Sequence, residues 1–135
     1  MQLAVIVATL EGCSFDSLND PQRFETALRE AIAAGGFTML HHHVHQFAPQ
    51  GVTAAAVLSE SHIALHSWPE DGVLFVDLAT CSSAEATRAA FNALCACFPH
   101  GRVVERELGY RGPDQGRPGS TFVDGATPVV DPRAA

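Results

Sequence analysis

The hydrophobic and polar positions along the chain follow two periods, one typical of strands and one typical of helices. Residues 2–9 form a continuous, largely β-branched apolar run, which predicts a strand in the middle of a sheet. Asp20 as N-cap and Pro21 at the first helical position predict the start of a helix, and Gly35-Gly36 predicts its end. We expect this helix to cover one face of the sheet, because its apolar residues recur at helical spacing: Phe24, Ala27, Leu28, Ala31 and Ile32.

Strand patterns dominate the middle of the chain. Four segments have the length and composition of strands: residues 37–47, 52–58, 61–68 and 73–80. The first of them carries the histidines His41, His42, His43 and His45. Turn signals separate the segments, namely Pro49-Gln50-Gly51 and the corner Trp68-Pro69-Glu70-Asp71-Gly72.

A second helix and a last strand follow. Ser82 with Glu85 three residues later predicts a capping box, and Pro99 and Gly101 predict the end of the helix. The apolar stripe of this helix consists of Phe91, Leu94, Cys95 and Phe98. Residues 102–108 alternate between polar and apolar, which predicts an edge strand.

The element order β-α-β-β-β-β-α-β predicts an α/β (α+β) fold. We expect a two-layer sandwich, with a mostly antiparallel sheet and two helices on one face. Residues 1–112 form a single domain in this interpretation, and residues 113–135, rich in Gly, Pro and Asp, form an extended or mobile tail. The other face of the sheet needs cover, so we expect a homodimer or a higher homo-oligomer.

Composition and charge narrow the partners. The 135 residues are 47% hydrophobic and 17% charged, as in a globular protein. The formal net charge is −7, with only eight Lys and Arg residues, which excludes nucleic acid as a partner and suits a cationic small molecule.

Cellular context is indicated by what the sequence lacks. No apolar run reaches the roughly 18 residues that cross a bilayer, and the first residues lack the basic flank of a secretory signal. We therefore expect a cytoplasmic protein without membrane contact. The four cysteines, at positions 13, 81, 95 and 97, form no Cys-x-x-Cys pair, which favours free thiols over disulfides or a cysteine-type zinc site.

Candidate chemistry concentrates in residues 59–70. In a strand, His62 and His66 share one face, while Ile63 and Leu65 share the other. Ser61 follows Glu60 at a connection between strands, where its hydroxyl can attack the preceding carbonyl. Such an N-to-O acyl shift gives an ester, elimination leaves dehydroalanine, and hydrolysis leaves a pyruvoyl group. A pyruvoyl carbonyl forms Schiff bases with amino acids and acts as an electron sink, as pyridoxal phosphate does. On this tripeptide alone, an ordinary strand hydroxyl is the simpler interpretation.

A resemblance over a longer span favours the chemical interpretation. Between His45 and Cys81 the sequence resembles the bacterial and archaeal short-chain S-adenosylmethionine decarboxylase proenzymes, which are pyruvoyl-dependent. The matching segments are His45-Gln46-Phe47-Ala48-Pro49-Gln50-Gly51-Val52-Thr53, Ser59-Glu60-Ser61-His62, His66-Ser67-Trp68-Pro69-Glu70 and Asp77-Leu78-Ala79-Thr80-Cys81. The resemblance implies an enzyme that decarboxylates S-adenosylmethionine and so supplies the aminopropyl donor for polyamine (spermidine) synthesis.

The resemblance also implies roles for individual residues. Cleavage between Glu60 and Ser61 would give a β chain of residues 1–60 and an α chain of residues 61–135 whose first residue becomes the pyruvoyl group. Thr53 would help to stabilise the oxyanion, His66 would be the base in the elimination, and Cys81 would reprotonate the substrate α-carbon.

The substrate would meet a further set of side chains. The resemblance implies that Phe47 and Trp68 bracket the adenine or the sulfonium, and that Glu70 binds the ribose hydroxyls. Three departures from the family pattern surround this site: the first strand lacks the usual Gly-x-His element and acidic residue, Ser82 stands where Gly is usual, and Ser67 stands where Thr is common.

Three alternative functions remain open. A relative that decarboxylates another amino acid, ornithine or arginine, would keep the pyruvoyl chemistry. A metal-binding module would use His41, His43 and His45, which share one strand face. A pseudoenzyme that never cleaves would keep Glu60, Ser61 and His66 without using them.

Overall fold

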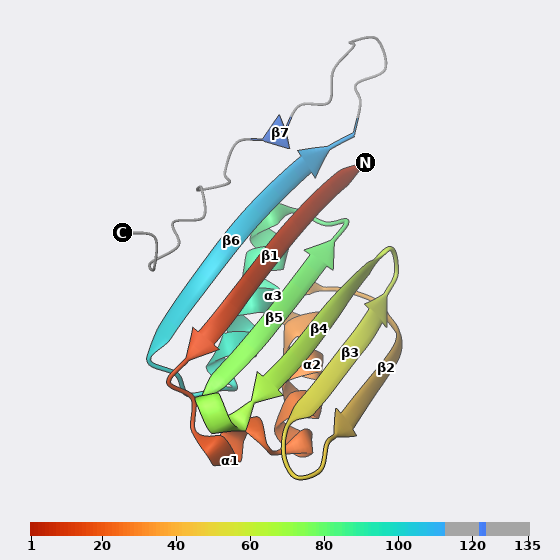
Figure 1. Cartoon of the computed structure of the whole chain (residues 1–135). Helices are drawn as coiled ribbons and strands as arrows, with labels where there is room; N and C mark the ends of the chain where they lie inside the picture. The colour runs from red at the N-terminus through yellow and green to blue at the C-terminus, as the bar shows by residue number, and fades with distance from the viewer. Residues whose placement is uncertain (113–121, 124–135) are drawn as a thin grey trace, which may run out of the picture.

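One antiparallel sheet with helices against one of its faces makes up the fold (Figure 1). The computed structural model describes residues 1–112 and 122–123. Within these residues the sheet has seven strands in the order β2-β3-β4-β5-β1-β6-β7, and every neighbouring pair is antiparallel. The elements are β1 (Gln2–Glu11), α1 (Phe15–Leu18), α2 (Pro21–Gly35), β2 (Met39–Gln46), β3 (Val52–Leu58), β4 (Ser61–Trp68), the 3-10 helix η1 (Pro69–Asp71), β5 (Val73–Thr80), α3 (Ala84–Ala96), β6 (Arg102–Arg111) and β7 (Phe122–Val123).

The core lies between the sheet and the helices α2 and α3. Alternate residues of β1 are buried against the helices, and the same alternation continues through β3, β4 and β5. Phe24 of α2 and Phe98 after α3 meet edge to face, with ring centroids 5.0 Å apart. The two helices therefore cover one face of the sheet together, which we call the helix face. The opposite face, which we call the outer face, carries no helix (Figure 1).

The caps of α2 agree with the sequence prediction. The Asp20 carboxylate accepts a hydrogen bond from the backbone N–H of Gln22 at 3.1 Å, and Gly36 ends the helix at φ +68°. The predicted antiparallel sheet with two helices on one face is also observed. None of the helices in the described residues is long and apolar enough to cross a membrane.

The cap of α3 differs from the prediction by one residue. Ser83, not Ser82, is the N-cap, and its hydroxyl accepts a hydrogen bond from the backbone N–H of Ala86 at 3.1 Å. The backbone N–H of Ser82 instead donates to Thr80 Oγ1 at 3.2 Å. This contact keeps Ser82 outside the helix, so the predicted capping box with Glu85 is wrong. The helix also ends earlier than predicted, at Ala96.

Short elements and strand ends are further departures. The helix α1 was not predicted; its N-cap Ser14 accepts a hydrogen bond from the backbone N–H of Ser17 at 3.2 Å. The strand β6 runs three residues beyond the predicted Leu108. It is not the outermost strand along its whole length, because β7 pairs with Gly109 and Tyr110. The rest of the predicted tail, residues 113–121 and 124–135, lies outside the described residues.

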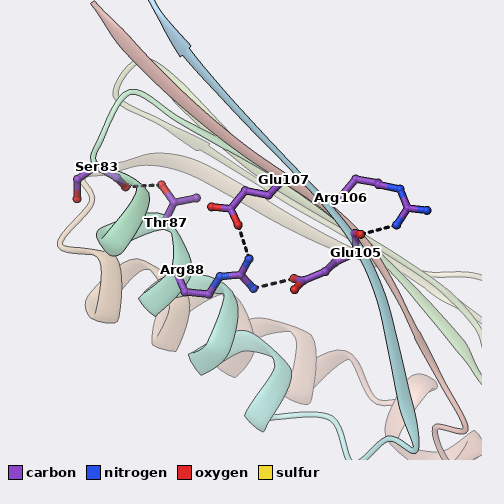
Figure 2. A network of polar contacts seen from close by, with 6 residues as sticks. All are labelled: Ser83, Thr87, Arg88, Glu105, Arg106 and Glu107. Carbon is purple, nitrogen blue, oxygen red and sulfur yellow. Dashed lines mark hydrogen bonds and ion pairs between the residues drawn. The ribbon is translucent and has the colours of Figure 1, made fainter. Parts of the chain in front are cut away.

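A network of charged side chains links α3 to β6 (Figure 2). The Arg88 guanidinium donates to Glu105 Oε2 and to Glu107 Oε2, each at 2.7 Å. Burial acts to lower the pKa of Arg88, but the hydrogen bonds to the two carboxylates outweigh it and raise that pKa. On the same helix, Thr87 Oγ1 donates to the Ser83 carbonyl at 2.8 Å. The network fixes the distance between α3 and the last long strand.

We predict that Arg88→Ala lowers the free energy of unfolding by about 1 kcal/mol, because two charge-assisted hydrogen bonds are lost at a site that is about one third exposed. Arg88→Lys keeps the charge but reaches only one carboxylate at a time, so its effect is smaller. The midpoint of urea unfolding measures both changes. An Arg88→Ala midpoint equal to that of the unaltered chain would contradict this account of the network.

Candidate functional site

The turn between β3 and β4 holds the backbone in an unusual conformation. Glu60 has φ +64°, and it is the one non-glycine residue with positive φ in the described part of the chain. For a residue with a Cβ, the left-handed region costs roughly 1–2 kcal/mol. The peptide bond that follows Glu60 leads into Ser61, the first residue of β4. The strain therefore sits next to the bond that the sequence marks for cleavage.

Cys81 lies against this bond. Its Sγ donates a hydrogen bond to the carbonyl oxygen of Glu60 at 2.9 Å, and Ser61 Oγ donates to the carbonyl of Ser59 at 3.4 Å. A cleft of about 210 Å³ opens here between the β3–β4 turn, the segment that follows α2 and the segment that precedes α3. Its lining comprises Gly36, Phe37, Thr38, Ser59, Glu60, Ser61, Thr80, Cys81 and Ser82. We call Glu60, Ser61 and Cys81 the cleavage cluster.

Cys81 differs from the other three cysteines in its exposure. It is exposed, Cys13 and Cys95 are buried, and Cys97 is half-buried. Burial raises the pKa of the Cys95 thiol to about 12, and it also raises the pKa of Cys13 and of Cys97. These three thiols stay protonated and packed. All four are free, as predicted.

The other predicted site residues form a second group, at the opposite end of the same strands. Thr53 Oγ1 and His66 Nδ1 are 2.9 Å apart, on neighbouring strands in register. Phe47 and Trp68 are exposed nearby, at 49% and 44% of their surfaces. Gln50 Nε2 donates to Glu70 Oε2 at 3.4 Å. We call Phe47, Thr53, His66, Trp68 and Glu70 the ring cluster.

One chain does not bring the two clusters together. Ser61 and His66 are five residues apart in β4, a distance of about 17 Å at the usual rise per residue. The two side chains also belong to opposite faces of the sheet. Ser61 alternates with buried Ile63 and Leu65 on the helix face, whereas His66 is on the outer face. Cys81 directly follows the end of β5 at Thr80, whose hydroxyl is buried against Thr87 of α3. Cys81 therefore lies at the Ser61 end of the strands, and His66 lies on the outer face at the other end.

Most of the outer face between the clusters is apolar. It includes Val57 and Leu108 among the exposed large hydrophobic residues, and partly covered Val7 and Phe75. A polar pair crosses it, with His62 Nε2 and Asp77 Oδ1 3.3 Å apart. No helix of the described chain covers this surface.

The histidine-rich strand β2 divides between the two faces, as predicted. His42 turns toward α2, where its Nε2 lies 2.8 Å from Glu25 Oε1. On the outer face, the rings of His43 and His45 stack with centroids 6.3 Å apart, and His45 meets Phe47 edge to face at 4.6 Å. Among the described residues, no group of three or more His, Cys, Asp or Glu side chains is arranged to hold a metal ion.

Sequence reasoning overlooked Asn19, which contacts the loop that bears Phe47. Its Oδ1 accepts a hydrogen bond from the backbone N–H of Gly51 at 3.0 Å. The residue follows an unpredicted helix and precedes the N-cap Asp20. No local pattern predicts a contact across 32 residues of chain.

Comparisons with known proteins agree on one family. Residues 4–109 match the family model described as S-adenosylmethionine decarboxylase. The chain is 37% identical over 103 residues to the S-adenosylmethionine decarboxylase proenzyme of Pelotomaculum thermopropionicum, across 76% of this chain and 82% of that one. It is 40% identical over 93 residues to the proenzyme of the same name from Carboxydothermus hydrogenoformans, across 69% and 73% of the two chains. Its fold is similar to the crystal structure of the adenosylmethionine decarboxylase from Aquifex aeolicus, with a TM-score of 0.73 and 27% identity over 78% of this chain and 87% of that chain.

We predict that Glu60→Gly, made in a Ser61→Ala chain so that cleavage does not intervene, raises the free energy of unfolding by about 0.5–1 kcal/mol. Relief of the left-handed strain exceeds the added freedom of glycine in the unfolded chain. Ser59→Gly is the matched control; it relieves no positive φ and should destabilise. Urea unfolding compares the Ser61→Ala chain with its Glu60→Gly and Ser59→Gly derivatives. If the Glu60→Gly derivative is no more stable than the Ser59→Gly derivative, the conformation of Glu60 is not strained.

Proposed function

Because this chain belongs to the S-adenosylmethionine decarboxylase family, we propose that it cleaves itself between Glu60 and Ser61 and then decarboxylates S-adenosylmethionine with a pyruvoyl group made from Ser61. The contact of the Cys81 thiol with the Glu60 carbonyl, at a left-handed residue, is the observation that carries this proposal. The product is the aminopropyl donor for spermidine synthesis. We place the enzyme in the cytoplasm, where its four thiols stay reduced.

Self-cleavage begins at the carbonyl that Cys81 contacts. Ser61 Oγ attacks the carbonyl carbon of Glu60, the C–N bond of that peptide breaks, and an ester joins Glu60 to the Ser61 side chain. Negative charge develops on the Glu60 oxygen during the attack, and the thiol 2.9 Å away donates a hydrogen bond to it. The strain at Glu60 raises the energy of the intact peptide and so favours its rearrangement.

Elimination completes the cleavage. A base removes the α-proton of Ser61, the ester C–O bond breaks, and Glu60 leaves with a free carboxylate. The dehydroalanine that remains at position 61 is hydrolysed with release of ammonia, so the whole process consumes one water. His66 is the proposed base: Nδ1 is bonded to Thr53 Oγ1, which orients the ring and leaves Nε2 for the proton. The Thr53 hydroxyl is also available to the oxyanion.

The separation of the two clusters calls for a second copy of the chain. In such a dimer the outer faces of two chains meet, and the two-fold axis lies between them, perpendicular to the strands. The strands of one chain then run opposite to the strands of its partner. This arrangement places the Ser61 end of one chain over the His66 end of its partner, at the roughly 10 Å spacing of stacked sheets. We propose a homodimer with two such sites, in which each chain gives its cleavage cluster to one site and its ring cluster to the other. The same contact buries the uncovered apolar face.

Substrate binding uses the ring cluster and the charge of the protein. Phe47 and Trp68, both about half exposed, offer two aromatic faces to the adenine and to the positively charged sulfonium. Glu70 accepts hydrogen bonds from the ribose hydroxyls. The net charge of −7 favours a cationic substrate. A decarboxylase for ornithine or arginine would not need two rings and a ribose partner.

Decarboxylation needs an electron sink and a proton donor. The pyruvoyl group supplies the sink for the electrons released as CO2 leaves the amino acid. Cys81 supplies the proton to the substrate α-carbon, since it is exposed in the cleft beside residue 61.

We predict that the freshly purified protein separates under denaturing conditions into residues 1–60 and residues 61–135, the larger lighter than its sequence mass by one ammonia. Intact mass spectrometry measures both. Ser61→Ala should abolish the cleavage completely, because no hydroxyl remains to attack Glu60, whereas Ser59→Ala should leave it intact. A wild-type chain that stays whole for days would favour the uncleaved pseudoenzyme.

We also predict that Ser61→Ala and His66→Ala chains complement each other when they are co-expressed with different tags. In a mixed dimer, Ser61 of the His66→Ala chain meets the partner's intact His66, so about half of the His66→Ala chains are cleaved. Tag-resolved mass spectrometry counts them. His66→Ala co-expressed with a chain that carries both Ser61→Ala and His66→Ala is the control: neither chain has His66, so cleavage is not rescued. Equal absence of cleavage in both mixtures would overturn the shared site.

A further inference from the structure

The residue Asn19 connects the end of α1 to the loop between β2 and β3, which is distant in sequence. It follows α1 and is half-buried. Its side-chain oxygen accepts the backbone N–H of Gly51 at 3.0 Å, and its backbone oxygen accepts Gln46 Nε2 at 3.1 Å. The two contacts lie at the two ends of the loop between β2 and β3, which carries Phe47. Asn19 therefore holds the two ends of this loop together.

Gly51 transmits this contact to the Phe47 ring. The backbone N–H of Phe47 donates to the Gly51 carbonyl at 2.8 Å. A Cβ placed on Gly51 would lie 3.4 Å from the Ser67 carbonyl oxygen and 4.0 Å from both Phe47 Cδ2 and Pro69 Cδ. Gly51 also has φ +105°, which favours glycine. The glycine thus lies between the Phe47 ring and the start of η1. A shift of Gly51 would therefore move the Phe47 ring.

The neighbouring residue Leu18 makes a separate contact, which supports the strands that carry Thr53 and His66. Ser67 Oγ donates to the Leu18 carbonyl at 2.7 Å and accepts the backbone N–H of Val52 at 2.9 Å. This hydroxyl joins β3 to β4 next to Thr53 and His66. Because it does not involve the Asn19 side chain, the Thr53–His66 pair keeps its support when that side chain is changed.

We propose that Asn19 is a positioning residue for substrate recognition, which holds Gly51 so that the Phe47 ring stands in the place where the adenosyl group stacks. This inference rests on the proposed function. Gly51 is buried, so without Asn19 its N–H has no acceptor and the loop must shift to reach water. Such a shift moves Phe47 and leaves the cleavage cluster, at the far end of the strands, unchanged.

Asn19→Ala and Asn19→Asp separate positioning from general stability. The aspartate keeps an oxygen for the Gly51 N–H, whereas alanine removes it. For Asn19→Ala we expect complete self-cleavage, kcat within about twofold of wild type and KM raised about five- to tenfold, as the loss of one hydrogen bond implies. Asn19→Asp should restore KM to within about twofold. Asn92→Ala, on the exposed side of α3, is the matched control.

A binding measurement gives a readout independent of turnover. Trp68 is the sole tryptophan of the chain, so its fluorescence reports on the ring cluster. Titration with 5′-methylthioadenosine, a neutral adenosine thioether, should quench it, with a Kd raised about five- to tenfold in Asn19→Ala and restored in Asn19→Asp.

The outcomes distinguish this inference from the proposed function. A wild-type chain that neither cleaves nor binds the thioether would refute the function. A wild-type chain that does both, with an Asn19→Ala chain of equal KM and Kd, would overturn the role of Asn19 alone. An Asn19→Ala chain that loses cleavage or kcat would show a structural role instead, and would also overturn the positioning role.

Discussion

The self-cleavage that we propose depends on the conformation of Glu60. A left-handed residue with a side chain is held in place only when its surroundings compensate for the cost, and here the thiol of Cys81 binds the carbonyl that the turn presents. In the proposed mechanism the same hydrogen bond serves the intact chain and the transition state of its cleavage, and it is worth more in the latter, where the oxygen carries charge. The strain and the donor therefore act on one bond.

The two-residue period of the strands determines where the remaining groups lie. Because alternate side chains of β4 face opposite sides, the residues that pack under α2 and α3 leave His62 and His66 on the outer face. Length then separates Ser61 from His66 within one chain. Within one rigid sheet that gap stays open, and for this reason the site that we propose takes its second group from a partner chain. Catalysis and dimerisation are consequently parts of one proposal, and the apolar outer face serves both.

The sequence predicted the fold well where the signals are local. The structure confirmed the predicted cap Asp20, the apolar stripe of α2 and the alternation in β4. The comparisons confirmed the family resemblance. The predicted cap of α3 was one residue too early, because the N–H of Ser82 bonds Thr80 Oγ1 and Ser83 caps the helix instead. Signals that depend on distant partners were lost. Asn19 had no signal, because its partner is 32 residues away. The spacing of site residues along the chain likewise could not show that they form two groups.

The departures from the family pattern differ in their consequences, and the structure separates them. Ser67 lies on the helix face, where its hydroxyl bonds Leu18 and Val52, so a change from threonine there leaves the outer face untouched. Ser82 lines the cleft beside Cys81, and its φ is not positive, so the position accepts a side chain without strain. A hydroxyl at Ser82 adds a polar group next to the proposed proton donor. Of these two positions, Ser82 is therefore the one that lies at the proposed site, on the side of proton delivery rather than of adenosine recognition.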